Sequence, residues 1–294
     1  MGTNKTITGF TKLVGLIGSP VAHSSSPEIH NAVFDKLGCN YAYVALDVAP
    51  DNLEAAVRGL EALGFVGYNV TAPHKTRIVP YLDEVSKVAE IMGSVNTVVI
   101  QNGRSLGDNA DGAAFMRNLV MQGINVLGKK MTVVGAGGAA SAAIVQAALD
   151  GVAQIDVFNR NDEHVARCQA LIERLKSHSD CQVTLYDLAD RERLRSSIAE
   201  SALLLHATNV GTPSAPGCLI DEDMLVPGLI VADMVYVPST TELLKRAAAR
   251  GNRIVSGVGV FVQQAAIGER LWFGIDMPLD FVADRFFSDD EQPV

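Results

Sequence analysis

The chain has 294 residues, of which 48% are hydrophobic and 19% are charged, so it can bury a sizeable core and is long enough for two domains. Its formal net charge is −9, which provides no basic field that would gather nucleic acid or an anionic membrane surface. We therefore expect neither a nucleic-acid partner nor a membrane partner.

The four cysteines and the N-terminal residues bear on the cellular compartment. The cysteines have neither the paired spacing of a zinc site nor the density of a secreted disulfide scaffold. Residues 1–12 lack the apolar region of a targeting peptide, and no apolar run reaches the roughly 18 residues of a membrane span. We expect reduced thiols and a cytoplasmic protein. No His, Cys or carboxylate cluster has ligand spacing, so we expect no metal.

Short apolar runs alternate with segments of helical periodicity, which indicates βαβ units and an α/β fold with largely parallel sheets. Strands are predicted over 13–17, 41–46, 67–71, 131–134 and 155–158. Helices are predicted over 28–37, 52–63, 139–149 and 261–273.

A glycine-rich turn joins the predicted strand 131–134 to the predicted helix 139–149 and matches the pattern GxGxxA. Its residues are Gly135, Ala136, Gly137, Gly138 and Ala139. Between a strand and a helix, such glycines let the backbone approach a pyrophosphate, whose charge the helix N-terminus favours. The alternative is a tight turn that holds no ligand.

The end of the next predicted strand bears on which nucleotide is used. An NAD-specific fold usually has an acidic residue there for the ribose, whereas this chain has Asn159 and Arg160, followed by Asp162. The asparagine can bond the ribose and the arginine can meet a 2′-phosphate, but no second arginine stands close by and Asp162 opposes a phosphate. We expect NAD, or dual use of NAD and NADP. A surface turn is the alternative.

Four polar clusters in the first half offer groups for a small polar ligand. The run His23-Ser24-Ser25-Ser26-Pro27 has hydroxyls at Ser24 and Ser26 that can bond a carboxylate near a helix N-terminus. Lys75 follows a predicted strand in Asn69-Val70-Thr71-Ala72-Pro73-His74-Lys75. Asn96 lies in Gly93-Ser94-Val95-Asn96-Thr97, and Asp111 in Gly107-Asp108-Asn109-Ala110-Asp111-Gly112. Each cluster taken alone is more typical of a helix cap, a surface lysine or a turn.

Taken in this order, the clusters resemble the shikimate/quinate dehydrogenase family, whose members carry HSxSP, NVTxPxK, GAVNT and GxNTDG before a GAGGAA-type nucleotide turn. The resemblance continues through His206-Ala207-Thr208-Asn209-Val210-Gly211, which is similar to NATxxG, and Tyr236-Val237-Pro238, similar to YxP. It ends with Gly257 through Gln264, similar to GxxMLxxQ, and covers about residues 13–274.

The resemblance implies an NAD(P)-dependent alcohol dehydrogenase that reversibly oxidises a ring hydroxyl of shikimate, quinate or a close analogue. It implies a substrate-binding catalytic domain over 1–112, completed by 257–294, and a Rossmann-type dinucleotide-binding domain over 113–256. The partner would be a small carboxylate substrate, and homodimer formation is left open.

The resemblance also implies roles for individual residues. Lys75 and Asp111 would form the proton-transfer pair. The other substrate-binding residues would be Ser24, Ser26, Thr71, Asn96, Tyr236 and Gln264. The cofactor-binding residues would be Gly135, Ala136, Gly137, Gly138, Ala139, Asn159, Arg160, Asp162, Thr208 and Gly257.

Some positions depart from the family patterns. Ala110 replaces the threonine of GxNTDG, Ser25 the leucine of HSLSP, Val237 the asparagine of YNP and Val260 the methionine of GxxML. The pattern NRTxxR of NADP-preferring members is reduced to Asn159-Arg160-Asn161, and His164 stands where its second arginine would fall. These departures bear on substrate and cofactor preference.

Two other functions compete with this one. A non-catalytic sensor of a similar ligand or nucleotide would have no need for both Lys75 and Asp111. A dehydrogenase of an unrelated substrate such as a folate would leave the hydroxyls of Ser24 and Ser26 unexplained.

Overall fold

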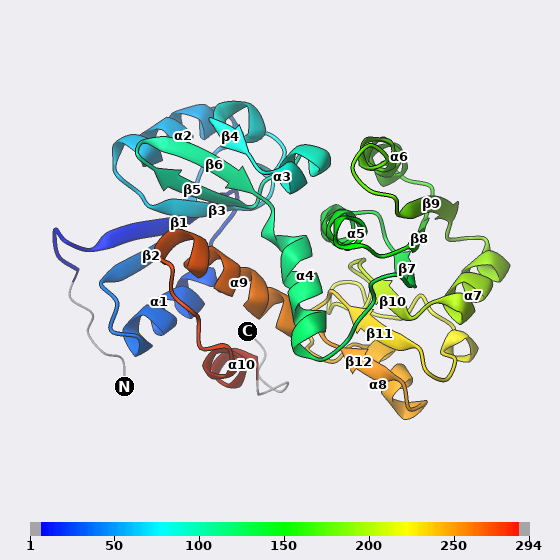
Figure 1. Ribbon diagram of the computed structural model, residues 1–294. Helices are drawn as coiled ribbons and strands as arrows, with labels where there is room; N and C mark the ends of the chain where they lie inside the picture. The colour runs from blue at the N-terminus through cyan, green and yellow to red at the C-terminus, as the bar shows by residue number, and fades with distance from the viewer. Residues whose placement is uncertain (1–6, 288–294) are drawn as a thin grey trace. The chain divides into compact units, whose positions relative to one another are not determined.

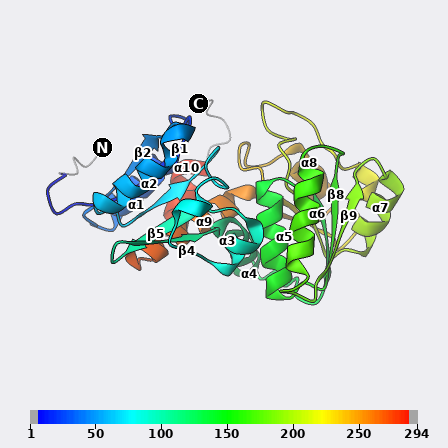
Figure 2. The same cartoon turned by 90° about the horizontal axis from the view of Figure 1, so that it is seen from above.

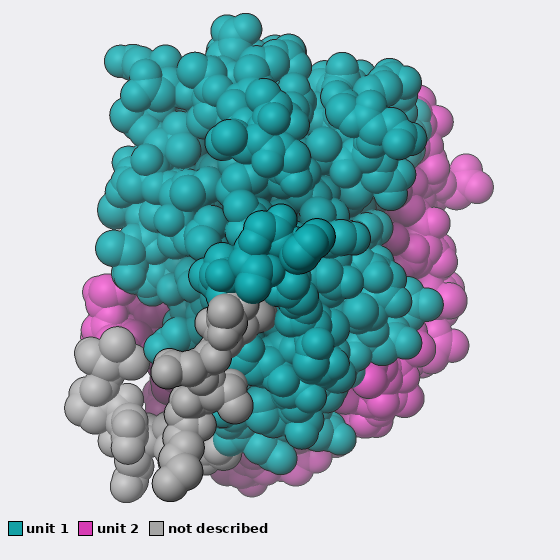
Figure 3. Space-filling view, turned by 90° about the vertical axis from the view of Figure 1, so that its left-hand side faces the viewer, with its two compact units in different colours: residues 1–110, 264–286 teal, residues 111–263, 287–294 magenta. Residues whose placement is uncertain are grey.

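The computed structural model describes residues 7–287, and the chain divides into two compact units (Figures 1 and 3). Unit 1 comprises residues 1–110 and 264–286, and unit 2 comprises residues 111–263 and 287–294. The expectations for residues 1–6 and 288–294 lie outside the described part of the chain.

Unit 1 contains a mixed six-stranded sheet in the order β2-β1-β3-β5-β6-β4. Its strands are β1 (Lys12–Gly18), β2 (Tyr41–Asp47), β3 (Gly67–Val70), β4 (Glu84–Val85), β5 (Thr97–Gln101) and β6 (Arg104–Asp108). Strand β1 is parallel to both β2 and β3, whereas β5 is antiparallel to both β3 and β6.

Helices cover both faces of this sheet. They are α1 (Ser26–Lys36), α2 (Leu53–Ala62), α3 (Lys87–Met92) and the C-terminal part of α9 (Gly257–Phe273), and α10 (Leu279–Phe287) follows. The residues of β1 alternate between two hydrophobic clusters, as the period of two in a strand requires. Ile17 packs with Val57 of α2, whereas Val14 packs with Phe34 of α1 and Trp272 of α9.

Unit 2 contains a parallel six-stranded sheet in the order β12-β11-β10-β7-β8-β9. Its strands are β7 (Lys130–Val134), β8 (Gln154–Asn159), β9 (Gln182–Asp187), β10 (Leu203–His206), β11 (Ile230–Asp233) and β12 (Arg253–Val255). The chain adds β8 and β9 on one side of β7 and then crosses to β10 on the other. The strand order therefore reverses at β7, where open α/β sheets form a ligand crevice at the carboxyl ends of the strands.

The helices of unit 2 are α4 (Ala110–Met121), α5 (Gly138–Asp150), α6 (His164–Leu175), α7 (Arg191–Glu200), α8 (Glu242–Ala249) and the start of α9. Helices α5 and α6 lie side by side (Figure 2). Most of the buried residues of α5 are alanines, whose small side chains allow close packing of this helix. The helices and strands predicted from the sequence are all present, with ends shifted by one or two residues except for the start of α9.

Two further findings concern the residues 7–287. No helix in this range is long and apolar enough to cross a membrane. The four cysteines of the chain are free thiols.

Candidate active site

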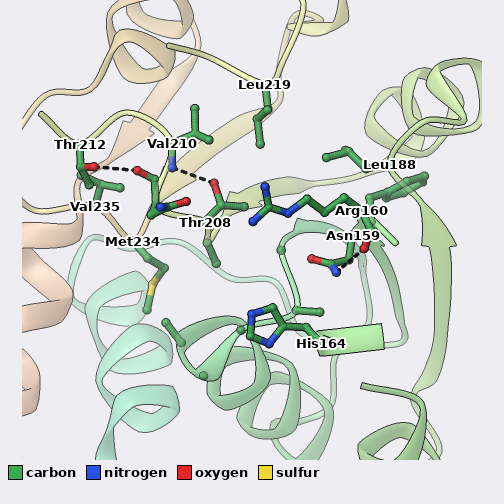
Figure 4. A pocket seen from close by; sticks show the side chains of 18 of the residues that line it. Asn159, Arg160, His164, Leu188, Thr208, Val210, Thr212, Leu219, Met234 and Val235 are labelled. Atoms are coloured by element: carbon green, nitrogen blue, oxygen red, sulfur yellow. Dashed lines mark hydrogen bonds between the residues drawn. The ribbon is translucent and has the colours of Figure 1, made fainter. Parts of the chain in front are cut away.

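A pocket of about 730 Å³ lies in unit 2 at the carboxyl ends of its central strands (Figure 4). The turn after β7, the end of β8 and the segments after β10 and β11 all contribute to its lining. This is the position where the strand order reverses, and it is the position at which parallel α/β sheets bind nucleotides.

The glycine-rich turn forms one wall of the pocket, and Gly135, Ala136, Gly137, Gly138 and Ala139 all line it. Gly135 has a φ of 116°, and a Cβ there would lie 2.5 Å from the carbonyl oxygen of Ala207. A Cβ at Gly137 would meet no protein atom within 4 Å. The open space before Gly137 adjoins the first turn of α5, whose backbone N–H groups lack helical acceptors, so the turn fits a pyrophosphate.

The predicted ribose-binding residues line the pocket at the end of β8. Asn159 donates through its side-chain amide to Asp162 Oδ1 at 2.9 Å, and Arg160 Nε donates to Asp162 Oδ2 at 2.9 Å. The backbone N–H of His164 also donates to this carboxylate and, as the largest cause, holds the pKa of Asp162 below its usual range. Arg160 is therefore paired with an ionised carboxylate.

The other predicted residues of unit 2 differ in their relation to the pocket. Thr208 and Tyr236 line it, and the ring of Tyr236 stacks on Phe261 with centroids 4.8 Å apart. Gly257 does not line it. A Cβ at Gly257 would lie 2.4 Å from the carbonyl oxygen of Val235, so this glycine allows α9 to approach the segment after β11.

In unit 1, the predicted substrate-binding segments gather at one edge of the sheet. The loop with Ser24 and Ser26 follows β1, and Thr71 follows β3, which is parallel to β1. Asn96 precedes β5, which runs antiparallel to β3, so it lies at this same edge. The backbone N–H of Thr71 donates to the carbonyl of Ile17 at 2.9 Å, which joins the ends of the two parallel strands.

At the start of α1, the serine run makes a turn hydrogen bond but no side-chain helix cap. Ser24 Oγ accepts from the backbone N–H of Ser26 at 3.3 Å, but the N-cap residue of α1 is Ser25, and its side chain makes no cap hydrogen bond. Ser24 and Ser26 are both half-buried. They therefore lie together at the N-terminus of α1, where an anion is favoured.

Two buried hydrogen bonds connect Tyr43 of β2 to Asn96 through Asn69, and the sequence assigned no role to Tyr43 or Asn69. Burial raises the pKa of Tyr43 far above its usual range. The phenol therefore stays protonated and donates to Asn69 Oδ1 at 2.8 Å. Asn69 Nδ2 donates to the carbonyl of Asn96 at 3.2 Å. Tyr43 and Asn69 thus hold β2, β3 and the segment before β5 in register.

The amide of Asn96 is fixed in orientation. Its Oδ1 accepts from the Thr97 hydroxyl at 2.9 Å and from the backbone N–H of Ala110 at 2.9 Å. Because both acceptor positions of this oxygen are used, the amide nitrogen is the group that can donate to a ligand.

The remaining predicted residues are divided between the two units. Lys75 belongs to unit 1, is half-buried, and accepts at its carbonyl from the backbone N–H of Val95 at 2.8 Å. Gln264 also belongs to unit 1 and is half-buried on α9. Asp111 belongs to unit 2, in the first turn of α4. Within residues 7–287, no group of three or more His, Cys, Asp or Glu side chains is placed to hold a metal ion.

The parallel sheet with its reversal at β7, the glycine turn and the pocket define a Rossmann-type dinucleotide-binding protein. A family model described as the shikimate dehydrogenase substrate binding domain matches residues 16–98. A protein from Listeria monocytogenes serotype 4b (strain F2365) named shikimate dehydrogenase (NADP(+)) is 44% identical over 283 residues, which are 96% of this chain and 97% of that relative. The chain therefore belongs to the shikimate dehydrogenase family and is an oxidoreductase.

Solved structures agree with this assignment. The chain matches a crystal structure of shikimate 5-dehydrogenase from Listeria monocytogenes in complex with shikimate and NAD, with a TM-score of 0.94 and 43% identity, covering 97% of this chain and 99% of that one. It also matches quinate dehydrogenase from Corynebacterium glutamicum in complex with NAD, with a TM-score of 0.85 and 31% identity, covering 95% and 99%.

Proposed function

We propose that this chain reversibly oxidises a ring hydroxyl of shikimate, quinate or a close analogue with NAD or NADP, and that it does so in the cytoplasm. The observation that carries the proposal is the glycine-lined pocket at the strand-order reversal of a chain that is 43% identical, almost end to end, to a protein crystallised with shikimate and NAD. Homodimer formation is left open.

In the proposed reaction, the alcohol carbon loses a hydride and the hydroxyl oxygen on that carbon loses a proton. The bound nicotinamide supplies the hydride acceptor. Lys75 exchanges the hydroxyl proton, and Asp111 orients both Lys75 and that hydroxyl. Ser24 and Ser26 donate to the substrate carboxylate, and the amide nitrogen of Asn96 donates to a ring hydroxyl. Such a division of roles assigns recognition and proton transfer to different side chains.

The direct test is to mix the protein with NAD or NADP and one candidate acid, and to follow the absorbance of reduced nicotinamide. We expect absorbance to rise with shikimate or quinate, and not in the same mixture without the acid. No rise with any of these acids and either nucleotide would favour the non-catalytic sensor.

The proposed role of Ser24 and Ser26 in binding the substrate carboxylate can be tested by substitution. Replacing both Ser24 and Ser26 by Ala should raise KM for shikimate or quinate at least about tenfold, because two hydroxyls that donate to a charged acceptor are lost. The matched control is Ser25→Ala, since Ser25 lies between them and its side chain makes no cap hydrogen bond. We expect that variant to keep the parent KM. An equal loss with a carboxamide analogue of the substrate would remove the serines from this role.

The pairing of Arg160 with Asp162 bears on the preference between NAD and NADP. The ratio of kcat/KM for NAD to that for NADP should be at least about one, since Arg160 is paired with Asp162 and a 2′-phosphate would meet that carboxylate. Asp162→Asn should shift the ratio about two- to fivefold towards NADP, the size expected for one charge contact at the protein surface. The amide oxygen of the variant can still accept from the turn.

The control for cofactor preference is Asp150→Asn, which removes one carboxylate at the opposite end of α5 from the pocket. We expect its ratio to equal that of the parent. A parent ratio that favours NADP by roughly a hundredfold or more would contradict the local charge argument.

A further inference from the structure

A buried histidine adjoins the nucleotide pocket and has no part in the roles assigned above. His206 ends β10 and Asp233 ends β11, and the two are register partners on neighbouring parallel strands. His206 is 2% exposed and Asp233 is 1% exposed. This chain has histidine where the family pattern NATxxG has asparagine. A buried polar pair at this position requires a full set of hydrogen-bond partners.

The structure supplies these partners. His206 Nδ1 lies 2.9 Å from Asp233 Oδ1, and His206 Nε2 lies 2.7 Å from Thr208 Oγ1. The carboxylate of Asp233 also accepts from the backbone N–H of Val235 at 3.0 Å and from the hydroxyl of Thr241 at 2.7 Å. Thr241 is the N-cap of α8 and accepts there from a backbone N–H, so its proton is available to Asp233.

For a neutral imidazole ring, these contacts assign the proton positions. Since Asp233 accepts from its other partners, the proton between the carboxylate and the ring belongs to His206 Nδ1. A neutral ring with that proton has a lone pair at Nε2, so Thr208 donates its hydroxyl proton to Nε2. The Thr208 oxygen then accepts from the backbone N–H of Val210 at 3.1 Å, as Figure 4 shows. One lone pair remains on this oxygen, and Thr208 lines the pocket.

We propose that His206 is a positioning residue that makes the Thr208 hydroxyl a hydrogen-bond acceptor for the dinucleotide. The group that fits this acceptor is a donor, an amide N–H or a ribose hydroxyl of the nucleotide. A phosphate oxygen, which only accepts, does not fit. The end of β10 therefore takes an uncharged part of the dinucleotide, whereas the glycine turn after β7 takes its pyrophosphate. This inference rests on the proposed use of NAD or NADP.

The test is the dissociation constant of NAD, measured by calorimetry on the full chain. Thr208→Val should weaken binding about three- to tenfold, the effect of one hydrogen bond between neutral groups. The matched control is Thr184→Val, the same change at an exposed position of β9 outside the pocket lining, and it should leave the affinity unchanged.

Two substitutions of His206 separate its two contacts. The side-chain oxygen of His206→Gln reaches the position of Nε2, so this variant keeps an acceptor for Thr208 and should bind NAD within about twofold of the parent. His206→Asn reaches only the position of Nδ1, so it should lose as much affinity as Thr208→Val. The double variant His206→Asn/Thr208→Val should bind no more weakly than either single variant, because both remove one interaction.

A spectroscopic measurement on the unsubstituted protein decides the proton positions even if a variant fails to fold. In long-range ¹H–¹⁵N spectra, we expect His206 to be protonated at Nδ1 and unprotonated at Nε2. Protonation at Nε2, or unchanged NAD affinity of Thr208→Val, would overturn the inference. If the unsubstituted protein binds neither NAD nor NADP, the proposed function fails instead.

Discussion

Lys75→Ala should lower kcat by at least about a hundredfold, with the fold intact. The substitution removes the group that we propose exchanges the hydroxyl proton, and a positioned acid or base contributes at least that factor. The KM for the substrate should change less than kcat, because the carboxylate is bound by Ser24 and Ser26. Steady-state kinetics in both reaction directions, with a thermal unfolding curve for each variant, measure the effect.

Asp111→Asn should reduce kcat to a similar extent, because the change removes the charge that orients Lys75 while keeping the size of the side chain. If the two residues act as one unit, the double variant should lose little more than either single variant. The control is Lys87→Ala, which removes an exposed lysine of unit 1 whose Nζ lies 3.4 Å from Glu90 Oε2. We expect this variant to keep the parent kcat. Near-normal turnover of Lys75→Ala would assign proton transfer to another group.

The hairpin of β5 and β6 has a local signal in the sequence, the dipeptide Asn102-Gly103. The strands are joined by the two residues Asn102 and Gly103, which have φ values of 53° and 74°. Positive φ at both positions defines a tight hairpin turn for which Asn-Gly is the preferred pair. That dipeptide was a sufficient signal for two antiparallel strands in the first sheet.

The start of α9 shows a different difficulty. The helix begins at Gly257 rather than at 261, although Gly257 and Gly259 both lower helix propensity. A Cβ at Gly259 would lie 2.4 Å from the side-chain oxygen of Asn118, so tertiary packing requires the glycines. Propensity judged along the sequence could not include a neighbour about 140 residues away.

The polar networks depended on strand register, which a single sequence does not reveal. His206 and Asp233 meet because β10 and β11 pair in parallel with these residues opposite one another. Tyr43 reaches Asn69 because β2 and β3 flank β1. The motifs therefore identified residues that were already grouped in short runs, whereas the residues that support them came from separate strands.

Gly137→Ala should weaken NAD binding about ten- to hundredfold without lowering the free energy of unfolding. A Cβ at this position would meet no protein atom within 4 Å, and Gly137 has a φ of −73°, so the folded chain can accept alanine. The same Cβ would occupy the space before the first turn of α5, where we place the pyrophosphate. Crowding by one methyl group against a closely fitted partner costs about 1–3 kcal/mol. Calorimetric titration with NAD and chemical unfolding measure the two effects separately.

Gly135→Ala provides the comparison, because its added Cβ would meet protein rather than ligand. That Cβ would lie 2.5 Å from the carbonyl oxygen of Ala207, at a φ of 116° that alanine rarely adopts. We expect the free energy of unfolding to fall by on the order of 3 kcal/mol, and NAD binding to weaken as the turn is displaced. We therefore expect the same substitution to lower the free energy of unfolding at Gly135 but not at Gly137. An unchanged NAD affinity of a folded Gly137→Ala protein would show that the pyrophosphate does not lie against this turn.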